Sequence, residues 1–174
     1  MKQTGLVQVY TGRGKGKTTA AFGLALREWG HGGRVCIVQF MKKGEEYGEV
    51  LAVRRLEGID LHQFGRKGFI AKGRQTEEDE LLAREALEFS REALSSGKYD
   101  LVVMDEACIA LDFQLISLRE VLSVVRSRSK RTEVVLTGVN APVGLIEAAD
   151  LVTEMRLVKH PYEAGLSARK GVEY

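Results

Sequence analysis

A glycine-rich segment near the start of the chain constrains its fold and its chemistry more than any other feature. Residues 11–19 read T-G-R-G-K-G-K-T-T and directly follow an apolar run at 6–10. A strand that passes through such glycines into a helix is typical of a loop that holds the phosphates of a nucleoside triphosphate. The segment therefore predicts an α/β protein that binds such a nucleotide.

Each residue type in this loop has a physical role in holding phosphate. Glycines let the backbone bend around the oxygens, because they have no Cβ atom and their N–H groups point at the anion. Lys17 supplies charge to the outer phosphates, and Thr18 offers a hydroxyl to a bridging Mg²⁺. We expect the nucleotide to contact Gly12, Arg13, Gly14, Lys15, Gly16, Lys17, Thr18 and Thr19.

The match to the usual pattern, G-x-x-x-x-G-K-S/T, is incomplete at its first position. The chain has Thr11 there, and the glycine follows one place later at Gly12. This changes the entry of the loop and leaves its core intact. A glycine-rich turn that binds nothing is the alternative, but G-K-T-T at the start of a helix is far more specific than a lone glycine pattern.

Length and composition predict one domain without an overall charge field. A chain of 174 residues, 44% of them hydrophobic, can build one substantial core over residues 1–174. The net charge of +2 argues against a surface built for nucleic acid. No apolar stretch approaches the ~20 residues that cross a bilayer, and no signal segment is visible. Cys36 and Cys108 have no metal or disulfide spacing, so we expect buried, reduced thiols in a cytoplasmic protein.

Apolar, β-branched runs alternate with segments of helical spacing. We expect strands at 6–10, 35–40, 59–64, 101–104, 133–137 and 150–154, and helices at 18–29, 76–94, 117–126 and 143–149. The alternation predicts a mostly parallel sheet flanked by helices on both faces, with ligands at the carboxyl ends of its strands.

The segment 41–75 differs from the rest of the chain. It has six glycines, many charges and one short strand candidate, so we expect loops around a site. Its basic residues allow two interpretations, the steering of an anionic ligand or, more commonly, a solvated surface. They are Lys42, Lys43, Arg54, Arg55, Arg66, Lys67, Lys72 and Arg74.

Two carboxylates, Asp105 and Glu106, follow the apolar run at 101–104. This order places an acid beside the Mg²⁺ of a phosphate loop, so Asp105, Glu106 and Thr18 are the candidate metal ligands. Successive strand residues point to opposite faces, so both carboxylates can face the ion only if the strand ends at Asp105. Which of the two holds the ion, directly or through water, stays open. Capping of the following helix is the alternative.

The chain also lacks a clear arginine-rich lid of the kind that nucleotide kinases close over both phosphate groups. Glu106 is a candidate to orient an attacking water. The missing lid favours a triphosphate that is held for chemistry at an atom other than the γ-phosphorus.

Three stretches are distinctive in combination. They read T-G-R-G-K-G-K-T-T-A-A-F-G-L-A-L-R, then V-V-M-D-E-A, then A-A-D-L-V-T-E-M-R-L-V-K-H-P-Y followed by A-G-L-S-A-R-K-G-V-E-Y. Together they resemble the ATP:corrinoid adenosyltransferases of the cobalamin pathway, which are built on a RecA-like P-loop fold. The resemblance runs nearly end to end.

The resemblance implies transfer of the 5′-deoxyadenosyl group of ATP to the cobalt(I) of a reduced corrinoid, with release of triphosphate. It implies Lys15, Lys17 and Glu106 as catalytic residues, because the lysines stabilise charge on the departing triphosphate and Mg²⁺ held by Thr18 and Glu106 shares that charge. It also implies a flavin-type electron donor and a homodimer.

The chain departs from the family pattern at two places. Relatives tend to carry G-F-T-W where residues 68–71 read G-F-I-A, so Phe69 matches as a corrinoid contact and the tryptophan has no counterpart. Ordinary loop packing is the alternative for Phe69. Family members often carry arginine where this chain has Val139. The segment 41–75 is then the candidate corrinoid-facing region.

Aromatic and terminal residues leave further alternatives. Lys159, His160 and Tyr162 follow the last strand candidate, where base, ribose or a partner subunit is within reach. A role as a structural hydrogen-bond donor is favoured for His160 over one as a catalytic base. We expect Phe22 and Trp29 in the core. A RecA-like ATPase that drives a partner or a nucleic-acid strand is the competing interpretation of the whole chain, and a non-catalytic nucleotide-binding regulator is a third.

Overall fold

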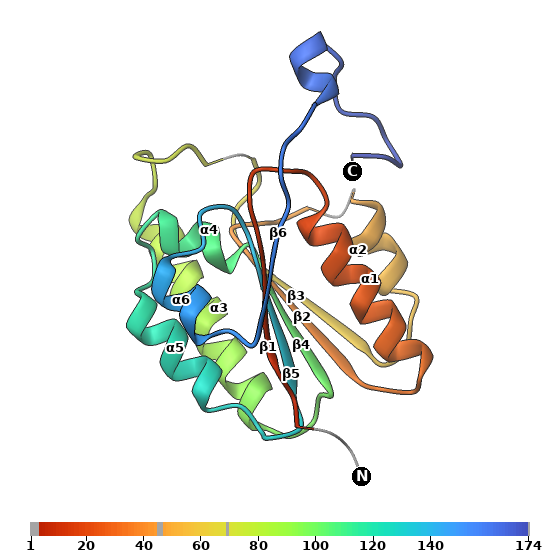
Figure 1. Cartoon of the computed structure of the whole chain (residues 1–174), viewed down its shortest axis with the longest axis vertical. Helices are drawn as coiled ribbons and strands as arrows, with labels where there is room; N and C mark the ends of the chain where they lie inside the picture. Colours follow the sequence, from red (N-terminus) through yellow and green to blue (C-terminus); the bar gives the residue numbers. More distant parts are fainter. Residues whose placement is uncertain (1–3, 45–46, 69, 174) are drawn as a thin grey trace.

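Six parallel strands form one sheet at the centre of the molecule (Figure 1). The computed structural model describes residues 4–44, 47–68 and 70–173. The strands are β1 (Val7–Thr11), β2 (Val35–Phe40), β3 (Ile59–Phe64), β4 (Leu101–Asp105), β5 (Glu133–Thr137) and β6 (Leu151–Glu154). Their order across the sheet is β3-β2-β4-β5-β1-β6. The predicted parallel sheet is confirmed, and the strand bounds agree within one residue.

Helices cover both faces of this sheet (Figure 1). One face carries α1 (Lys17–Gly30) and α2 (Gly48–Val53), and the other carries α3 (Glu77–Ser95), α4 (Ala107–Asp112), α5 (Leu118–Arg126) and α6 (Val143–Ala148). The predicted layering, with helices on both faces, is confirmed (Figure 1). Separately, no helix within the described ranges has the length and apolar character that a membrane crossing requires.

Side chains of the central strands alternate between two apolar layers. On β2, Cys36 and Val38 pack with the layer under α3, whereas Val35 and Ile37 pack with the layer under α1. β2 is buried throughout because helices cover both faces of the sheet, which explains why it is apolar at nearly every position. Cys36 and Cys108 are both buried and free, as predicted for the thiols.

Two short helices correct the sequence prediction. α2 lies in the segment 41–75, which was expected to contain only loops and one strand, and α4 follows the second carboxylate. α2 reads G-E-V-L-A-V inside a glycine-rich segment, and α4 reads A-C-I-A-L-D, which is apolar at nearly every position, so neither displays an amphipathic helical pattern. Val50 and Val53 are buried, and α2 packs beside β3. The expectation of loops alone is therefore wrong for this part of 41–75.

The chain after β6 forms what we call the C-terminal arm, residues 155–173. It leaves the carboxyl edge of the sheet, passes through a 3₁₀ turn at Pro161–Ala164, and returns toward the start of α1 (Figure 1). The Lys15 ammonium donates to the Val172 carbonyl oxygen at 3.0 Å and pairs with the Glu173 carboxylate at 2.9 Å. The end of the arm therefore lies against the glycine-rich loop.

Candidate functional site

The glycine-rich loop connects β1 to α1 at the carboxyl edge of the sheet. β1 ends at Thr11 and α1 begins at Lys17. Gly16, just before the helix, has a φ of 116°, which L side chains rarely adopt. Glycine at this position lets the loop turn into the helix at the edge where parallel α/β sheets bind ligands.

Two other glycines bring the loop against the C-terminal arm. A Cβ atom on Gly12 would lie 2.5 Å from the Met155 carbonyl oxygen, and one on Gly14 would lie 2.7 Å from the same atom. The sequence analysis assigned both glycines to phosphate alone. The structure adds a second requirement, because no larger residue fits between loop and arm without displacement.

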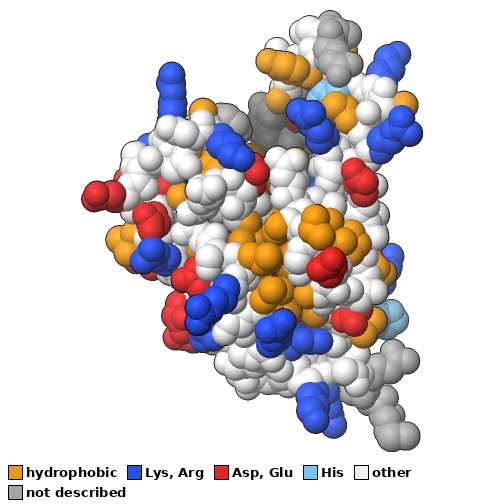
Figure 2. All heavy atoms as spheres, turned by 60° about the vertical axis from the view of Figure 1, so that its left-hand side comes forward, with side chains coloured by type: hydrophobic (Ala, Val, Ile, Leu, Met, Phe, Trp, Pro, Cys, Tyr) orange, Lys and Arg blue, Asp and Glu red, His pale blue; other side chains and the backbone are white. Residues whose placement is uncertain are grey.

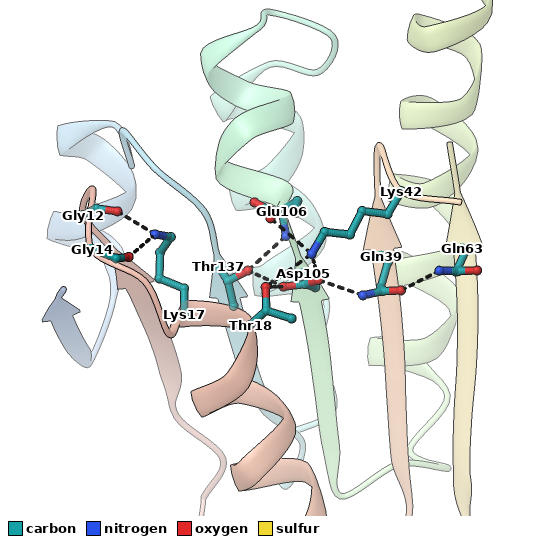
Figure 3. A network of polar contacts seen from close by, with 10 residues as sticks. All are labelled: Gly12, Gly14, Lys17, Thr18, Gln39, Lys42, Gln63, Asp105, Glu106 and Thr137. Carbon is teal, nitrogen blue, oxygen red and sulfur yellow. Dashed lines mark hydrogen bonds and ion pairs between the residues drawn. The ribbon is translucent and has the colours of Figure 1, made fainter. Parts of the chain in front are cut away.

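Lys17 folds back over the loop. Its ammonium donates to the carbonyl oxygens of Gly12 and Gly14, each at 2.8 Å (Figure 3). Burial lowers the pKa of Lys17 below its ordinary value, although the charge of Glu106 acts in the opposite direction. Neutral carbonyl oxygens are weaker partners for an ammonium than phosphate oxygens, so this charge is available to an anion.

The two predicted carboxylates face the same point. β4 ends at Asp105, and Glu106 follows in a left-handed conformation with a φ of 62°. The condition that the strand ends at Asp105 is therefore met. The Lys42 ammonium lies 2.9 Å from Asp105 Oδ2 and 3.2 Å from Glu106 Oε1 (Figure 3). Glu106 occupies the N-cap position of α4, but its side chain makes no capping hydrogen bond, so the capping alternative is wrong for this residue.

Asp105 is fully buried, and four hydrogen bonds occupy its two oxygens. Oδ1 accepts from the hydroxyls of Thr18 at 2.9 Å and Thr137 at 2.7 Å. Oδ2 accepts from the side-chain amide of Gln39 at 2.9 Å and from Lys42. Burial acts to raise the pKa of Asp105, but Lys42 and the hydrogen bonds outweigh it and hold the pKa below its ordinary value. Asp105 is therefore an ionised anchor that orients the Thr18 hydroxyl.

Glu106 keeps one oxygen unused. Its Oε2 is buried and has no hydrogen-bond partner in the described part of the chain. Burial raises the pKa of Glu106 above its ordinary value; Lys42 opposes this shift and Asp105 adds to it. Buried polar atoms are seldom left without a partner, and hard divalent cations prefer carboxylate and hydroxyl oxygens. The oxygens of Glu106 and Thr18 therefore fit an ion such as Mg²⁺.

Lys42 is the charged member of this cluster that the favoured sequence interpretation placed on a solvated surface. A solvated surface was the favoured interpretation of the basic residues in 41–75, and Lys43 and Lys67 are indeed exposed. Lys42 instead faces inward. Burial acts to lower the pKa of Lys42, but the charges of Asp105 and Glu106 outweigh it and hold the pKa above its ordinary value. The available signal was the position of Lys42, directly after the apolar run at 35–40.

A row of polar side chains extends the cluster across the sheet (Figure 3). Gln39 lies opposite Asp105 in the strand register, and Gln63 lies opposite Gln39. The Gln63 amide donates to Gln39 Oε1 at 2.9 Å, and the Thr137 hydroxyl accepts from the Glu106 N–H at 3.0 Å. The sequence analysis missed all three neutral residues, although a glutamine inside the run V-C-I-V-Q-F was a visible signal.

Comparison with known proteins decides the family. A family model described as ATP:corrinoid adenosyltransferase BtuR/CobO/CobP matches residues 3–174. The chain belongs to this family. It is 40% identical to a corrinoid adenosyltransferase of Pseudomonas aeruginosa over 173 residues, which cover 99% of this chain and 85% of that protein. It is 35% identical to a corrinoid adenosyltransferase of Escherichia coli K12 over 172 residues, which cover 99% and 87%. The expectations of this family and of a transferase are confirmed.

The fold is also similar to a solved structure outside the family. The flagellar accessory protein FlaH of Methanocaldococcus jannaschii superposes with a TM-score of 0.60, over 87% of this chain and 71% of that one. Sequence identity is 10%, so the similarity concerns the fold alone. The expected RecA-like P-loop fold of the adenosyltransferase family is confirmed.

Several of the predicted nucleotide-binding residues border one cavity. A cavity of about 460 Å³ is bordered by residues 15–19, Lys42, Glu106 and the end of the arm. Lys15 lies at this cavity but is paired with the arm, and Arg13 and Thr19 are exposed. Phe69 lies outside the described residues.

The remaining aromatic and terminal residues lie either in structural contacts or on the surface. His160 Nδ1 accepts from the Tyr162 N–H at 3.2 Å at the start of the 3₁₀ turn, so this histidine makes a local structural contact as an acceptor and not as the expected donor. Tyr162 and Lys159 are exposed. Phe22 is buried and Trp29 packs against the apolar layer under α1, as expected.

Proposed function

We propose that the protein transfers the 5′-deoxyadenosyl group of ATP to the cobalt(I) of a reduced corrinoid and releases inorganic triphosphate. The cobalt supplies an electron pair to C5′, the cobalt–carbon bond forms, and the bond between C5′ and the triphosphate oxygen breaks. The single observation that carries the proposal is the cluster of Lys17, Thr18 and Glu106 at one cavity, in a chain of this family.

The loop residues hold the nucleotide and stabilise its leaving group in this proposal. Lys17 moves from the loop carbonyls to the outer phosphates, where its charge opposes the negative charge that builds as the C5′–O bond breaks. Lys15 adds charge after it leaves Glu173. The N–H groups and dipole at the start of α1 favour an anion at the same place.

Mg²⁺ is part of the proposal. Thr18 and Glu106 are the proposed direct ligands, because Asp105 already accepts four hydrogen bonds whereas Glu106 Oε2 has no partner among the described residues. Asp105 then acts by orienting the Thr18 hydroxyl. When bound, the ion neutralises charge on the triphosphate.

The segment 41–75 is the proposed corrinoid-facing region, with Phe69 as a contact. Its second half is anchored on both sides of residues 68–71. The Arg66 guanidinium binds the Asp79 carboxylate with two hydrogen bonds, at 2.7 and 2.9 Å, and the Lys72 ammonium pairs with Asp112 at 2.7 Å. These contacts fix the described residues on either side of Phe69, which supports this region as a binding surface.

We also propose that the protein is a cytoplasmic homodimer and that a flavin-type donor supplies the electron that reduces the corrinoid cobalt to cobalt(I). The face that carries α6 and β6 supports the dimer, because hydrophobic side chains gather at the centre of this face (Figure 2). Exposed hydrophobic residues on these elements are Val143, Ile146, Leu151 and Val152. Large exposed apolar patches mark interaction surfaces. Light scattering on a size-exclusion column would give twice the chain mass if the proposal holds.

Product analysis tests the reaction. The purified protein is incubated without oxygen with ATP, Mg²⁺ and chemically reduced cobalamin, and the phosphate products are separated. We expect a light-sensitive adenosylated corrinoid with one triphosphate per corrinoid, and loss of both products in Lys17→Ala. ADP and phosphate with an unchanged corrinoid would refute the proposal and favour the RecA-like ATPase.

A further inference from the structure

Lys42 lies just beyond the carboxyl end of β2 and faces into the carboxylate cluster. Met41, the residue before it, has a φ of 54°, a left-handed conformation that is uncommon for a residue with a long side chain. Met41 packs against the same apolar layer as Phe40, so the alternation of the strand is interrupted there. Lys42 then faces the polar row on the α1 side of the sheet. A strained backbone thus places this ammonium in the cluster.

Three oxygen-bearing side chains surround the ammonium (Figure 3). The Lys42 nitrogen lies 2.9 Å from Asp105 Oδ2 and 3.2 Å from Glu106 Oε1. It also donates to the Thr18 hydroxyl oxygen at 3.3 Å. The same three residues are the candidate metal ligands of the sequence analysis. In the structure, the oxygens of these three residues bind the Lys42 ammonium.

We propose that Lys42 is an internal cation of this site, whose ammonium lies beside the Thr18 hydroxyl and the Glu106 carboxylate, where a divalent metal bound by these two residues would have to lie. Two cations cannot lie among the same few oxygens, because like charges at contact distance repel strongly in a partly buried site. A divalent metal alone must therefore displace an ammonium that is already paired twice. This inference rests on the metal-binding role given to these residues in the proposed function.

A triphosphate offers Lys42 a second set of partners. Lys42 and Lys17 border the same cavity as the glycine-rich loop. Phosphate oxygens are strong acceptors for an ammonium, so nucleotide entry draws Lys42 from the carboxylates toward the phosphates. The Thr18 hydroxyl and the Glu106 carboxylate then lose their contacts with the ammonium and can bind the metal that accompanies the nucleotide. Metal binding is in this way coupled to nucleotide binding. Without nucleotide, the Lys42 ammonium keeps free metal from binding.

The test measures the binding of Mn²⁺ alone, from the loss of the paramagnetic resonance signal of the free ion. Lys42→Gln keeps an N–H donor and removes the charge, and Lys43→Gln makes the same change at the exposed neighbour. We expect Lys42→Gln to bind Mn²⁺ at least about tenfold more tightly than the wild type, within the usual range of coupling between two ligands. Lys43→Gln should match the wild type. Equal affinities of the wild type and Lys42→Gln would overturn the proposal.

If Lys42→Gln folds poorly, a second variant and a measurement on the wild type still test the proposal. Lys42→Met also removes the charge and should show the same gain in Mn²⁺ affinity. In the wild type, millimolar MgCl₂ without nucleotide should leave the melting temperature unchanged, and a clear rise would contradict the proposal. Neither measurement contains ATP or a corrinoid, so its outcome is independent of whether adenosyl transfer is found in the product analysis.

Discussion

The backbone N–H of Gly14 donates to the carbonyl oxygen of Met155 at 2.6 Å, and the Met155 N–H donates to the carbonyl oxygen of Thr11 at 2.8 Å. The proposed phosphate-binding loop is therefore bonded on one side to the segment that follows the edge strand β6. An amide expected to point at phosphate is already used within the protein. The C-terminal arm is thus part of the loop's geometry, and residues far apart in the sequence shape the site together.

Gly14→Ala tests the close contact between loop and arm. The new Cβ atom would lie 2.7 Å from the Met155 carbonyl oxygen and 2.8 Å from its carbon. Relief of such a clash typically costs about 1–3 kcal/mol, so we expect a loss of this size in the free energy of unfolding, together with weaker ATP binding. Gly23→Ala is the matched control, because a Cβ atom there meets nothing within 4 Å in the interior of α1. It should stabilise the protein by roughly 0.5–1 kcal/mol. Equal effects of the two changes would contradict this account.

Thr137→Val tests the network around Asp105. The Thr137 hydroxyl donates to Asp105 Oδ1 and accepts from the Glu106 N–H, so valine leaves two buried groups without this partner. We expect a loss of about 1–3 kcal/mol in the free energy of unfolding, measured with urea, and weaker binding of ATP with Mg²⁺. Thr132→Val removes another buried hydroxyl, which donates to the Tyr99 carbonyl oxygen at 2.9 Å, and should lower stability without a change in nucleotide affinity. Unchanged nucleotide affinity in Thr137→Val would refute a role of the network in binding.

Asp79→Asn tests how acid affects the start of α3. The hydrogen bonds from Arg66 hold the pKa of Asp79 below its ordinary value, and Asp79 also closes the capping box with Thr76. A carboxyl whose pKa is lower in the folded state stabilises the protein above its unfolded pKa of about 3.9, and this contribution is lost as the pH falls toward the folded value. We expect Asp79→Asn to cost about 1–2 kcal/mol at neutral pH and the difference from the wild type to shrink below about pH 4.

Urea denaturation at several pH values measures this difference. Glu77→Gln, in the same first turn but exposed, is the control and should cost less at neutral pH. A gap between Asp79→Asn and the wild type that stays constant down to pH 2 would show that the carboxylate charge is not what stabilises this turn.

Glu173→Gln tests the contact between the arm and the loop. Hydrogen bonds from Arg169 and Lys15 lower the pKa of Glu173 to about 2, so the carboxylate stays charged at every pH of practical use. Removing the charge takes away the ion pair of Lys15, which keeps only its hydrogen bond to the Val172 carbonyl oxygen, and takes an anion away from the cavity. We expect ATP to bind severalfold more tightly by calorimetry, with an unchanged melting temperature. Glu85→Gln, an equal change of charge on exposed α3 surface, should leave the affinity as it is. Weaker binding in Glu173→Gln would mean that this residue helps to hold the nucleotide.

The sheet and the main helices could be predicted because their signals are local. The runs at 35–40, 59–64 and 133–137 match the observed strands residue for residue. β2 is buried throughout and is apolar at nearly every position, whereas the edge strand β3 reads I-D-L-H-Q-F and is mostly half-buried. α2 and α4 escaped prediction because neither has an amphipathic pattern: α2 begins in a glycine-rich segment, and α4 is apolar at nearly every position. Their position is set by tertiary contacts, such as the burial of Val50 and Val53 beside β3.

The candidate site was only partly visible for a similar reason. The loop and the pair Asp105–Glu106 are contiguous motifs, so their residue types and order identify them. Lys42 and Gln39 join the site through strand register, which brings β2 beside β4, and a single sequence does not display that pairing. The contact of Gly14 with the arm depends on the pairing of β1 with β6, which lies about 140 residues later in the chain, and a single sequence does not display this pairing either.

The fate of the ATP carbon C5′ tests the central claim most directly. ATP labelled with ¹³C at C5′ is incubated without oxygen with the protein, Mg²⁺ and chemically reduced cobalamin, and the corrinoid is isolated in the dark. The account predicts that the label lies on carbon bonded to cobalt, in equal amount to the released triphosphate. Label that remains in ATP, ADP or AMP, with no labelled corrinoid, would contradict it.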